Sequence, residues 1–245
     1  MLDFAFILAG FAVGLIVGLT GVGGGSLMTP ILIFFFGVKP YLAVGTDLLF
    51  AAFTKLGGTV SLARQRLVPW RVVGLLCAGS IPAALAALWA LRHLGPESAA
   101  AQRLMTSTLG VALLLTAAAT LYKVLVFSPE RAAAEAARRS AQFAHSTAPR
   151  HWSLPVLLGA VIGLLVTFTS VGAGAIGVSV LLLVFPHLPL PRIIAADIAY
   201  AVPLTLVAGL GHASLGSVDW PLLAQLLMGS LPGIWLGSRL VSRTP

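Results

Sequence analysis

The chain has 245 residues, of which 58% are hydrophobic and 9% charged, and its formal net charge is +8. Soluble domains carry about 25% charged residues, so this composition excludes an ordinary water-soluble core and indicates a polytopic helical membrane protein. The cations stand mostly in short connections between apolar runs, where they set topology, so nucleic acid is not an expected partner.

Apolar runs of membrane-spanning length recur along the chain, and they predict spans at 4–20, 42–63, 70–92, 102–127, 153–170, 192–212 and 220–240. Two shorter apolar pieces, 26–37 and 174–186, reach only part of the way across a bilayer. The first run lacks a basic n-region and a clear cleavage site, which predicts a retained span. The single cysteine, Cys77, lies in an apolar run and excludes an intrachain disulfide.

Each short piece follows a glycine-rich break, the first from Gly18 to Ser26 and the second from Gly163 to Gly174. Non-helical backbone at membrane depth needs protein or an aqueous cavity around it. The N–H groups and dipole of the next helix then attract an anion. We therefore expect anion-binding groups at Thr20, Gly21, Gly23, Gly24, Gly25, Ser26, Thr169, Ser170, Gly172 and Gly174. The alternative is that these glycines serve only close helix packing.

The two breaks belong to an internal repeat, since Val22, Gly23 and Gly25 match Val171, Gly172 and Gly174 at an offset of 149. Further along, an offset of 150 aligns Asp47 with Asp197, Trp70 with Trp220, and 79–82 with 229–232. This predicts a first membrane repeat at 1–127, a linker at 128–151 and a second repeat at 152–245. The second repeat has no counterpart of 102–127, either by truncation or by nature. Glycine-broken segments at corresponding positions of two halves indicate a transporter's binding site.

Each broken segment is either one kinked crossing or a hairpin whose arms return to one side. With hairpins, eleven cations lie inside and three outside, against eight and six for kinked crossings, so the positive-inside rule favours hairpins. The repeats are then inverted, and the linker is cytoplasmic. Residues 64–71 hold three arginines whereas the equivalent 213–219 holds none, which also favours inversion over a parallel duplication.

Ionisable groups inside a membrane are costly and usually line a pathway. Asp47 and Asp197 are matched carboxylates for substrate or proton handling, or else helix caps at the interface. Lys55 follows Asp47 by about two helical turns and lies in the middle of its span. It is either a ligand for the anion or one member of a structural ion pair. The equivalent residue of the second half is Thr205. His212 either binds and releases a proton in the transport cycle or is an interfacial histidine at the end of a helix.

These residues resemble the sulfite exporter TauE/SafE family over nearly the whole chain. The resemblance rests on the glycine cluster 18–25, on 43–49 with Lys55, and on 218–220 with 229–233. It implies transport of sulfur-containing anions such as sulfite, sulfonates or thiosulfate, and duplicated halves that each open with a glycine-rich signature.

The resulting expectation is an all-α secondary transporter of the inner (plasma) membrane, without enzymatic activity or a cofactor. Its partners would be the lipid bilayer, a small anion and a coupling proton or sodium ion. The anion would bind at the midplane between the two broken hairpins, and one half would rock against the other. A passive anion channel and a permease for another small organic anion are the alternatives. The sequence favours no oligomeric state.

Overall fold

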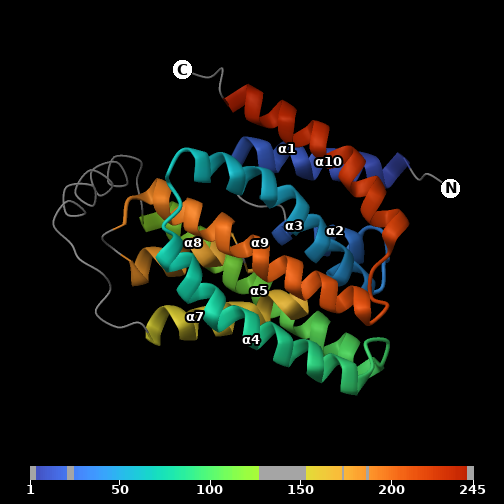
Figure 1. Cartoon of the computed structure of the whole chain (residues 1–245). Helices are drawn as coiled ribbons and strands as arrows, with labels where there is room; N and C mark the ends of the chain where they lie inside the picture. Colours follow the sequence, from blue (N-terminus) through green and yellow to red (C-terminus); the bar gives the residue numbers. More distant parts are fainter. Residues whose placement is uncertain (1–3, 21–24, 127–152, 173, 186–187, 242–245) are drawn as a thin grey trace.

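The computed structural model describes residues 4–20, 25–126, 153–172, 174–185 and 188–241. The regular structure in these ranges is helical, which confirms the all-α prediction for them (Figure 1). The helices are α1 (Phe4–Thr20), α2 (Gly25–Phe34), α3 (Pro40–Arg64), α4 (Trp70–Leu94), α5 (Ala99–Val126), α7 (Ser153–Thr169), α8 (Ala175–Val184), α9 (Leu190–Ser214) and α10 (Trp220–Val241).

Two helices of the described part, α4 and α9, could cross a membrane by length and apolar composition alone. This is fewer than the predicted spans. The breaks leave α1 and α7 with 17 residues each, and the 25 residues of α3 include Asp47, Lys55 and Arg64. The outer surface is nevertheless apolar, with Phe4 and Leu114 exposed by 77% and 73%. Such a surface fits lipid better than water.

The two larger hydrophobic clusters of the described residues organise the helices, and each combines helices from both sequence halves. One core joins α4 with α7, α8 and α9, and it includes Val44 and Leu48 of α3. The other joins α10 with α1, α2 and α3. We call α4, α7, α8 and α9 the α4 bundle, and α1, α2, α3 and α10 the α10 bundle. In each bundle, the fourth helix of one half therefore packs on the first and third helices of the other half.

Glycines bring the swapped helices into backbone contact. A methyl group on Gly10 or Gly14 of α1 would overlap the backbone of Leu226 or Ser230 in α10. The contacts advance together along both helices, so α1 and α10 are parallel neighbours. The same contacts recur between α7 and α4, as Gly159 with Leu76 and Gly163 with Ser80.

The two bundles meet where α3 crosses α9, and these helices are antiparallel. Gly45 of α3 lies against His212, near the end of α9. Thr59, near the end of α3, lies 3.5 Å from the carbonyl oxygen of Ile198, near the start of α9. Because α3 and α9 are equivalent in the repeat, their antiparallel contact means that the equivalent helices of the two halves run in opposite directions. Its middle lies close to Lys55.

The chain passes between the bundles through two loops of the same geometry, 65–69 and 215–219. Arg66 and Gly216 occupy equivalent positions with φ of 55° and 70°. The N–H of Arg66 donates to Ala63 at 3.0 Å, and that of Gly216 donates to Ala213 at 3.1 Å. Both helices thus end in the same left-handed turn, which glycine adopts readily and arginine does not.

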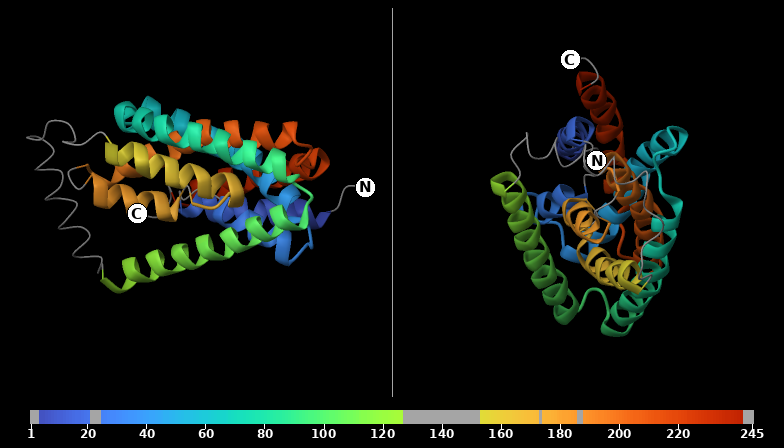
Figure 2. Two further views of the ribbon diagram at one scale, coloured as in Figure 1. Left: turned by 90° about the horizontal axis from the view of Figure 1, so that it is seen from below. Right: turned by 90° about the vertical axis from the view of Figure 1, so that its left-hand side faces the viewer.

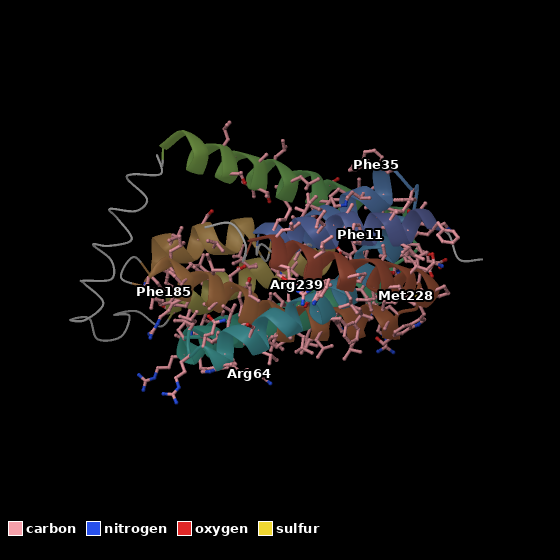
Figure 3. The ribbon with its side chains drawn as sticks, turned by 90° about the horizontal axis from the view of Figure 1, so that it is seen from above. Phe11, Phe35, Arg64, Phe185, Met228 and Arg239 are labelled. Atoms are coloured by element: carbon pink, nitrogen blue, oxygen red, sulfur yellow. The ribbon has the colours of Figure 1, made fainter. Side chains whose placement is uncertain are left out.

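The helices that follow the breaks end at opposite sides of the molecule. Phe6 in α1 and Phe36 after α2 stack at 4.7 Å between ring centroids, so α2 returns toward the side where α1 began. Phe35 and Phe185 are equivalent, and Figure 3 shows them at opposite ends. Helix α5 lies at the edge of the molecule, outside both bundles (Figure 2). Its Leu109 packs near Val171 of the second break.

Candidate substrate site

Asp47 is fully buried on α3 and is held by the helix that follows the first break. The hydroxyl of Thr29 donates to Oδ2 of Asp47 at 2.5 Å, and the N–H of Thr29 donates to the same oxygen at 3.2 Å. Both donors lie in the N-terminal half of α2, whose dipole favours an anion at that end. Asp47 therefore anchors α2 to α3.

The second break brings Ser170 to the same carboxylate. Ser170 has a φ of 57°, so the chain leaves α7 through a left-handed residue. Its hydroxyl lies within range of the Asp47 carboxyl. Neither Ser170 Oγ nor Asp47 Oδ1, however, makes a hydrogen bond of normal geometry. The two groups are therefore close neighbours. The break of one half thus faces the carboxylate of the other.

Asp197 occupies the equivalent place on α9 and is 2% exposed. Its Oδ1 lies so close to Gly177 of α8 that a methyl group there would overlap it. The backbone of Gly174, where α8 begins, lies within hydrogen-bonding range of the same carboxyl. Oδ1 itself has no hydrogen-bond partner. Asp197 is therefore held by the start of α8.

These contacts change the interpretation of the helix starts after the breaks. The sequence predicts that their N–H groups attract a substrate anion. In the structure, Asp47 interacts with the first half of α2, and Asp197 with the start of α8. A carboxylate satisfies a helix N-terminus as any other anion does. The protein's own anions therefore occupy positions that the sequence suggests for the substrate.

Lys55 lies between the two carboxylates. It is 4% exposed, near the middle of the α3–α9 contact. Its ammonium is attracted most strongly by Asp197 and also by Asp47. The backbone agrees, since Thr59, one turn beyond Lys55, contacts Ile198, the residue after Asp197. Lys55 and Asp197 thus form an electrostatic link between the two bundles.

Two predicted site residues make mainly structural contacts. The hydroxyl of Thr205 donates to the carbonyl of Ala201 at 2.8 Å within its own helix. His212 Nε2 lies 3.0 Å from the carbonyl oxygen of Thr167. A carbonyl can only accept, so Nε2 carries the hydrogen and His212 joins α9 to the last turn of α7. His212 is fully buried, unlike an interfacial histidine at a helix end.

The remaining predicted site residues lie at the helix ends beside the breaks or within the breaks themselves. Thr169 closes α7, where its hydroxyl donates to Leu165 at 2.6 Å. Gly172 and Gly174 have φ of 128° and 143°, a region that favours glycine. Gly21, Gly23 and Gly24 lie outside the described residues, as does the linker 128–151. Thr20 ends α1, and Gly25 and Ser26 begin α2.

Sequence reasoning missed Thr29 and Tyr200. Thr29 follows the first break by about one turn, and a hydroxyl at that position was the available signal. Tyr200 is fully buried three residues after Asp197, so both lie on one face of α9. Its hydroxyl has no hydrogen-bond partner.

Comparisons with known proteins agree over the length of the chain. Residues 6–245 match the family model described as sulfite exporter TauE/SafE. A "probable membrane transporter protein YjnA" of Bacillus subtilis is 37% identical over 98% of this chain and 90% of its own length. The "probable membrane transporter protein YdhB" of the same organism is 25% identical over 98% of this chain and 90% of its own length. No solved structure matches.

Proposed function

Because this chain belongs to the sulfite exporter TauE/SafE family of membrane transporters, we propose that it is a secondary transporter of small sulfur-containing anions. The candidate substrates are sulfite, sulfonates and thiosulfate. The observation that carries the proposal is the buried Lys55 at the contact of the two bundles. A cation at that depth needs an anionic partner and marks a substrate pathway.

The proposed fold consists of two inverted repeats that each open with a broken hairpin. The antiparallel contact of the equivalent helices α3 and α9 supports this arrangement. The stacking of Phe6 on Phe36 supports a returning arm in the first hairpin. Phe35 and Phe185, which lie at opposite ends, support the inversion (Figure 3). The substrate site would lie between the hairpins, as in other transporters with discontinuous helices.

We expect alternating access to move the bundles rather than the sequence halves. The backbone contacts of α1 with α10, and of α4 with α7, hold helices from opposite halves together. Two halves could rock as rigid bodies only if those contacts broke. The α4 and α10 bundles can instead rock about the α3–α9 contact, with the loops 65–69 and 215–219 as hinges.

The proposed location is the inner (plasma) membrane, with linker 128–151 on the cytoplasmic side. In this orientation eleven cations lie inside, as the positive-inside rule requires. The coupling ion would be a proton or a sodium ion. The same inverted repeat would also suit a passive anion channel, or a permease for another small organic anion.

The test is anion binding and flux with purified protein. Wild type, Lys55→Met and Lys39→Met are each tested with sulfite, thiosulfate, sulfonates and sulfate. Binding is measured by thermal shift, and flux is then measured in proteoliposomes. Lys39 is exposed just before α3 and serves as the matched control. Lys55→Met should remove ligand stabilisation and flux, whereas Lys39→Met should keep both.

Equal flux through wild type and Lys55→Met would remove the assigned role of Lys55. Flux that saturates and follows an ion gradient would favour the transporter over the channel. No response of wild type to any sulfur-containing anion would refute the proposed substrate class.

A further inference from the structure

The geometry points to a proton that travels with the anion, and to Asp197 as the group that carries it. In this inference, which rests on the proposed function, the substrate anion binds Lys55 only when Asp197 is protonated. The protein is then an anion–proton cotransporter, because one group of contacts serves either the protein's carboxylate or the substrate.

The first step of the argument is that Asp197 and an incoming anion would use the same partners. Asp197 is the strongest electrostatic partner of Lys55. It also lies at the start of α8, against Gly177 and within range of the Gly174 backbone. A buried ammonium and a helix N-terminus are the two features that would bind a small anion here. An anion at Lys55 must therefore displace an ionised Asp197.

The second step concerns charge. With both carboxylates ionised, Asp47, Lys55 and Asp197 carry a net charge of −1 in surroundings that expose none of them by more than 4%. A further monovalent anion would raise this to −2, which is unfavourable where the dielectric constant is low. Protonation of Asp197 leaves Asp47 and Lys55 to balance each other. The site then accepts one anion for each proton.

The third step distinguishes the two carboxylates. Asp47 receives two hydrogen bonds from Thr29, and these tie it to α2 as an anion. Asp197 is approached instead by the backbone of Gly174, and each of the two carboxylates leaves its Oδ1 without a hydrogen-bond partner. Lys55 and Asp197 also belong to different bundles. Loss of their attraction on protonation would therefore loosen the contact across which the bundles move.

Few other titratable groups of the described residues lie near Asp197. Lys55 faces it from α3 and also interacts with Asp47, and Tyr200 lies one turn further along α9. Cys77 of α4 lies close to Tyr200. The sequences of α7 and α8 contain no titratable side chain. Among these neighbours Lys55 is the only cation, so protonation of Asp197 acts chiefly on Lys55.

The cycle moves a proton and an anion without covalent chemistry. A proton from water on one side binds an Asp197 carboxyl oxygen, and the anion pairs with Lys55. After the bundles rock, the anion leaves to the other side and the proton returns to water there. Asp197 then pairs with Lys55 again. One monovalent anion and one proton cross together, so transport is electroneutral.

The experiment uses methanesulfonate, an anion that stays charged at all working pH values and carries no proton itself. Its affinity for the full-length wild-type protein is measured by thermal shift from pH 5 to pH 9. Where Asp197 is mostly ionised, Kd should rise by about tenfold per pH unit, since binding takes up one proton. In proteoliposomes with an internal pH dye, a methanesulfonate gradient should drive protons in the same direction at a one-to-one ratio.

Asp197→Asn removes the proton carrier but keeps the shape of the side chain. It should bind methanesulfonate with a Kd that no longer depends on pH, and it should move at least about tenfold fewer protons per anion. Glu97→Gln, at an exposed position between α4 and α5, is the matched control and should retain the wild-type pH dependence. The pH titration of wild type is decisive even where Asp197→Asn does not fold.

The outcomes separate the two proposals. Methanesulfonate binding with a pH-independent Kd in wild type would overturn the proton coupling and leave the sulfur-anion function standing. Coupled proton movement that persists in Asp197→Asn would overturn the assignment of Asp197. If wild type binds no sulfur-containing anion at all, the proposed function fails, and the coupling fails with it.

Discussion

Thr29 and Asp47 join the helix after the first break to α3 through two hydrogen bonds on one carboxylate oxygen, at 2.5 Å and 3.2 Å. Asp197, its equivalent on α9, lies against Gly177 of α8 and is the strongest electrostatic partner of Lys55 in the other bundle. Two carboxylates that the repeat makes equivalent thus have different surroundings. This difference assigns a structural role to the first and a titrating role to the second in the mechanism proposed above.

Thr29→Val should destabilise the protein, because the side chain keeps its shape while Asp47 loses its hydroxyl donor. Removal of one partner from a buried charged hydrogen bond costs about 1–3 kcal/mol. Thermal melting in detergent measures the loss. Thr106→Val is the control, since its exposed hydroxyl donates only to Gln102 within its own helix. Equal melting temperatures for the two variants would contradict the anchoring role of Thr29.

Gly79→Ala should disrupt the contact of α4 with α7, because the added methyl group overlaps the backbone of Val156. Such overpacking costs at least about 1–3 kcal/mol. Gly74→Ala in the same helix meets nothing within 4 Å and should be neutral or stabilise by up to about 1 kcal/mol. Size-exclusion profiles and melting curves compare them. Gly229→Ala should behave like Gly79→Ala, and a neutral result there would argue against equivalent contacts.

His212→Gln should keep stability and transport, whereas His212→Ala should lose about 1–3 kcal/mol. Glutamine can still donate to the Thr167 carbonyl, which His212 Nε2 contacts at 3.0 Å. Alanine leaves that buried carbonyl without its partner. Melting curves and methanesulfonate flux test the pair. Stable His212→Gln protein without flux would instead assign His212 a role in proton handling.

Gly177→Ala should impair anion binding without any change of charge, because its methyl group occupies the place of Asp197 Oδ1. Gly58→Ala is the control, as its methyl group would meet Ile198 at an ordinary 3.6 Å. Methanesulfonate titration of both variants should show weaker binding only for Gly177→Ala. Unchanged affinity would mean that the Asp197 position does not control the site.

Cysteines at Arg64 and Ser214 should react with a membrane-impermeant thiol reagent from opposite sides of the membrane. The two residues are exposed and equivalent in the repeat, and both lie where a helix ends before a loop between the bundles. In a Cys77→Ala background, Arg64→Cys should be labelled from the cytoplasmic side and Ser214→Cys from the outside. Labelling from one side only would indicate a parallel duplication.

Much of the architecture follows from the sequence alone. Membrane class, helix positions, the two breaks and the internal offset are local or compositional properties, because apolar length and glycine clusters act on the segment that contains them. The family resemblance came from the same motifs. Asp47, Lys55 and Asp197 were candidates because an ionisable residue in an apolar run is costly wherever the chain folds.

Only the tertiary structure decided which of these groups meet. The exchange of α4 and α10 between the halves depends on backbone contacts at Gly10, Gly79 and their equivalents, and periodicity within one helix contains no information about its neighbour. The proximity of Lys55 to Asp197 likewise depends on where α3 crosses α9. The sequence could therefore indicate that the charges matter. Their pairing required long-range packing, which sets the distances on which electrostatic attraction depends.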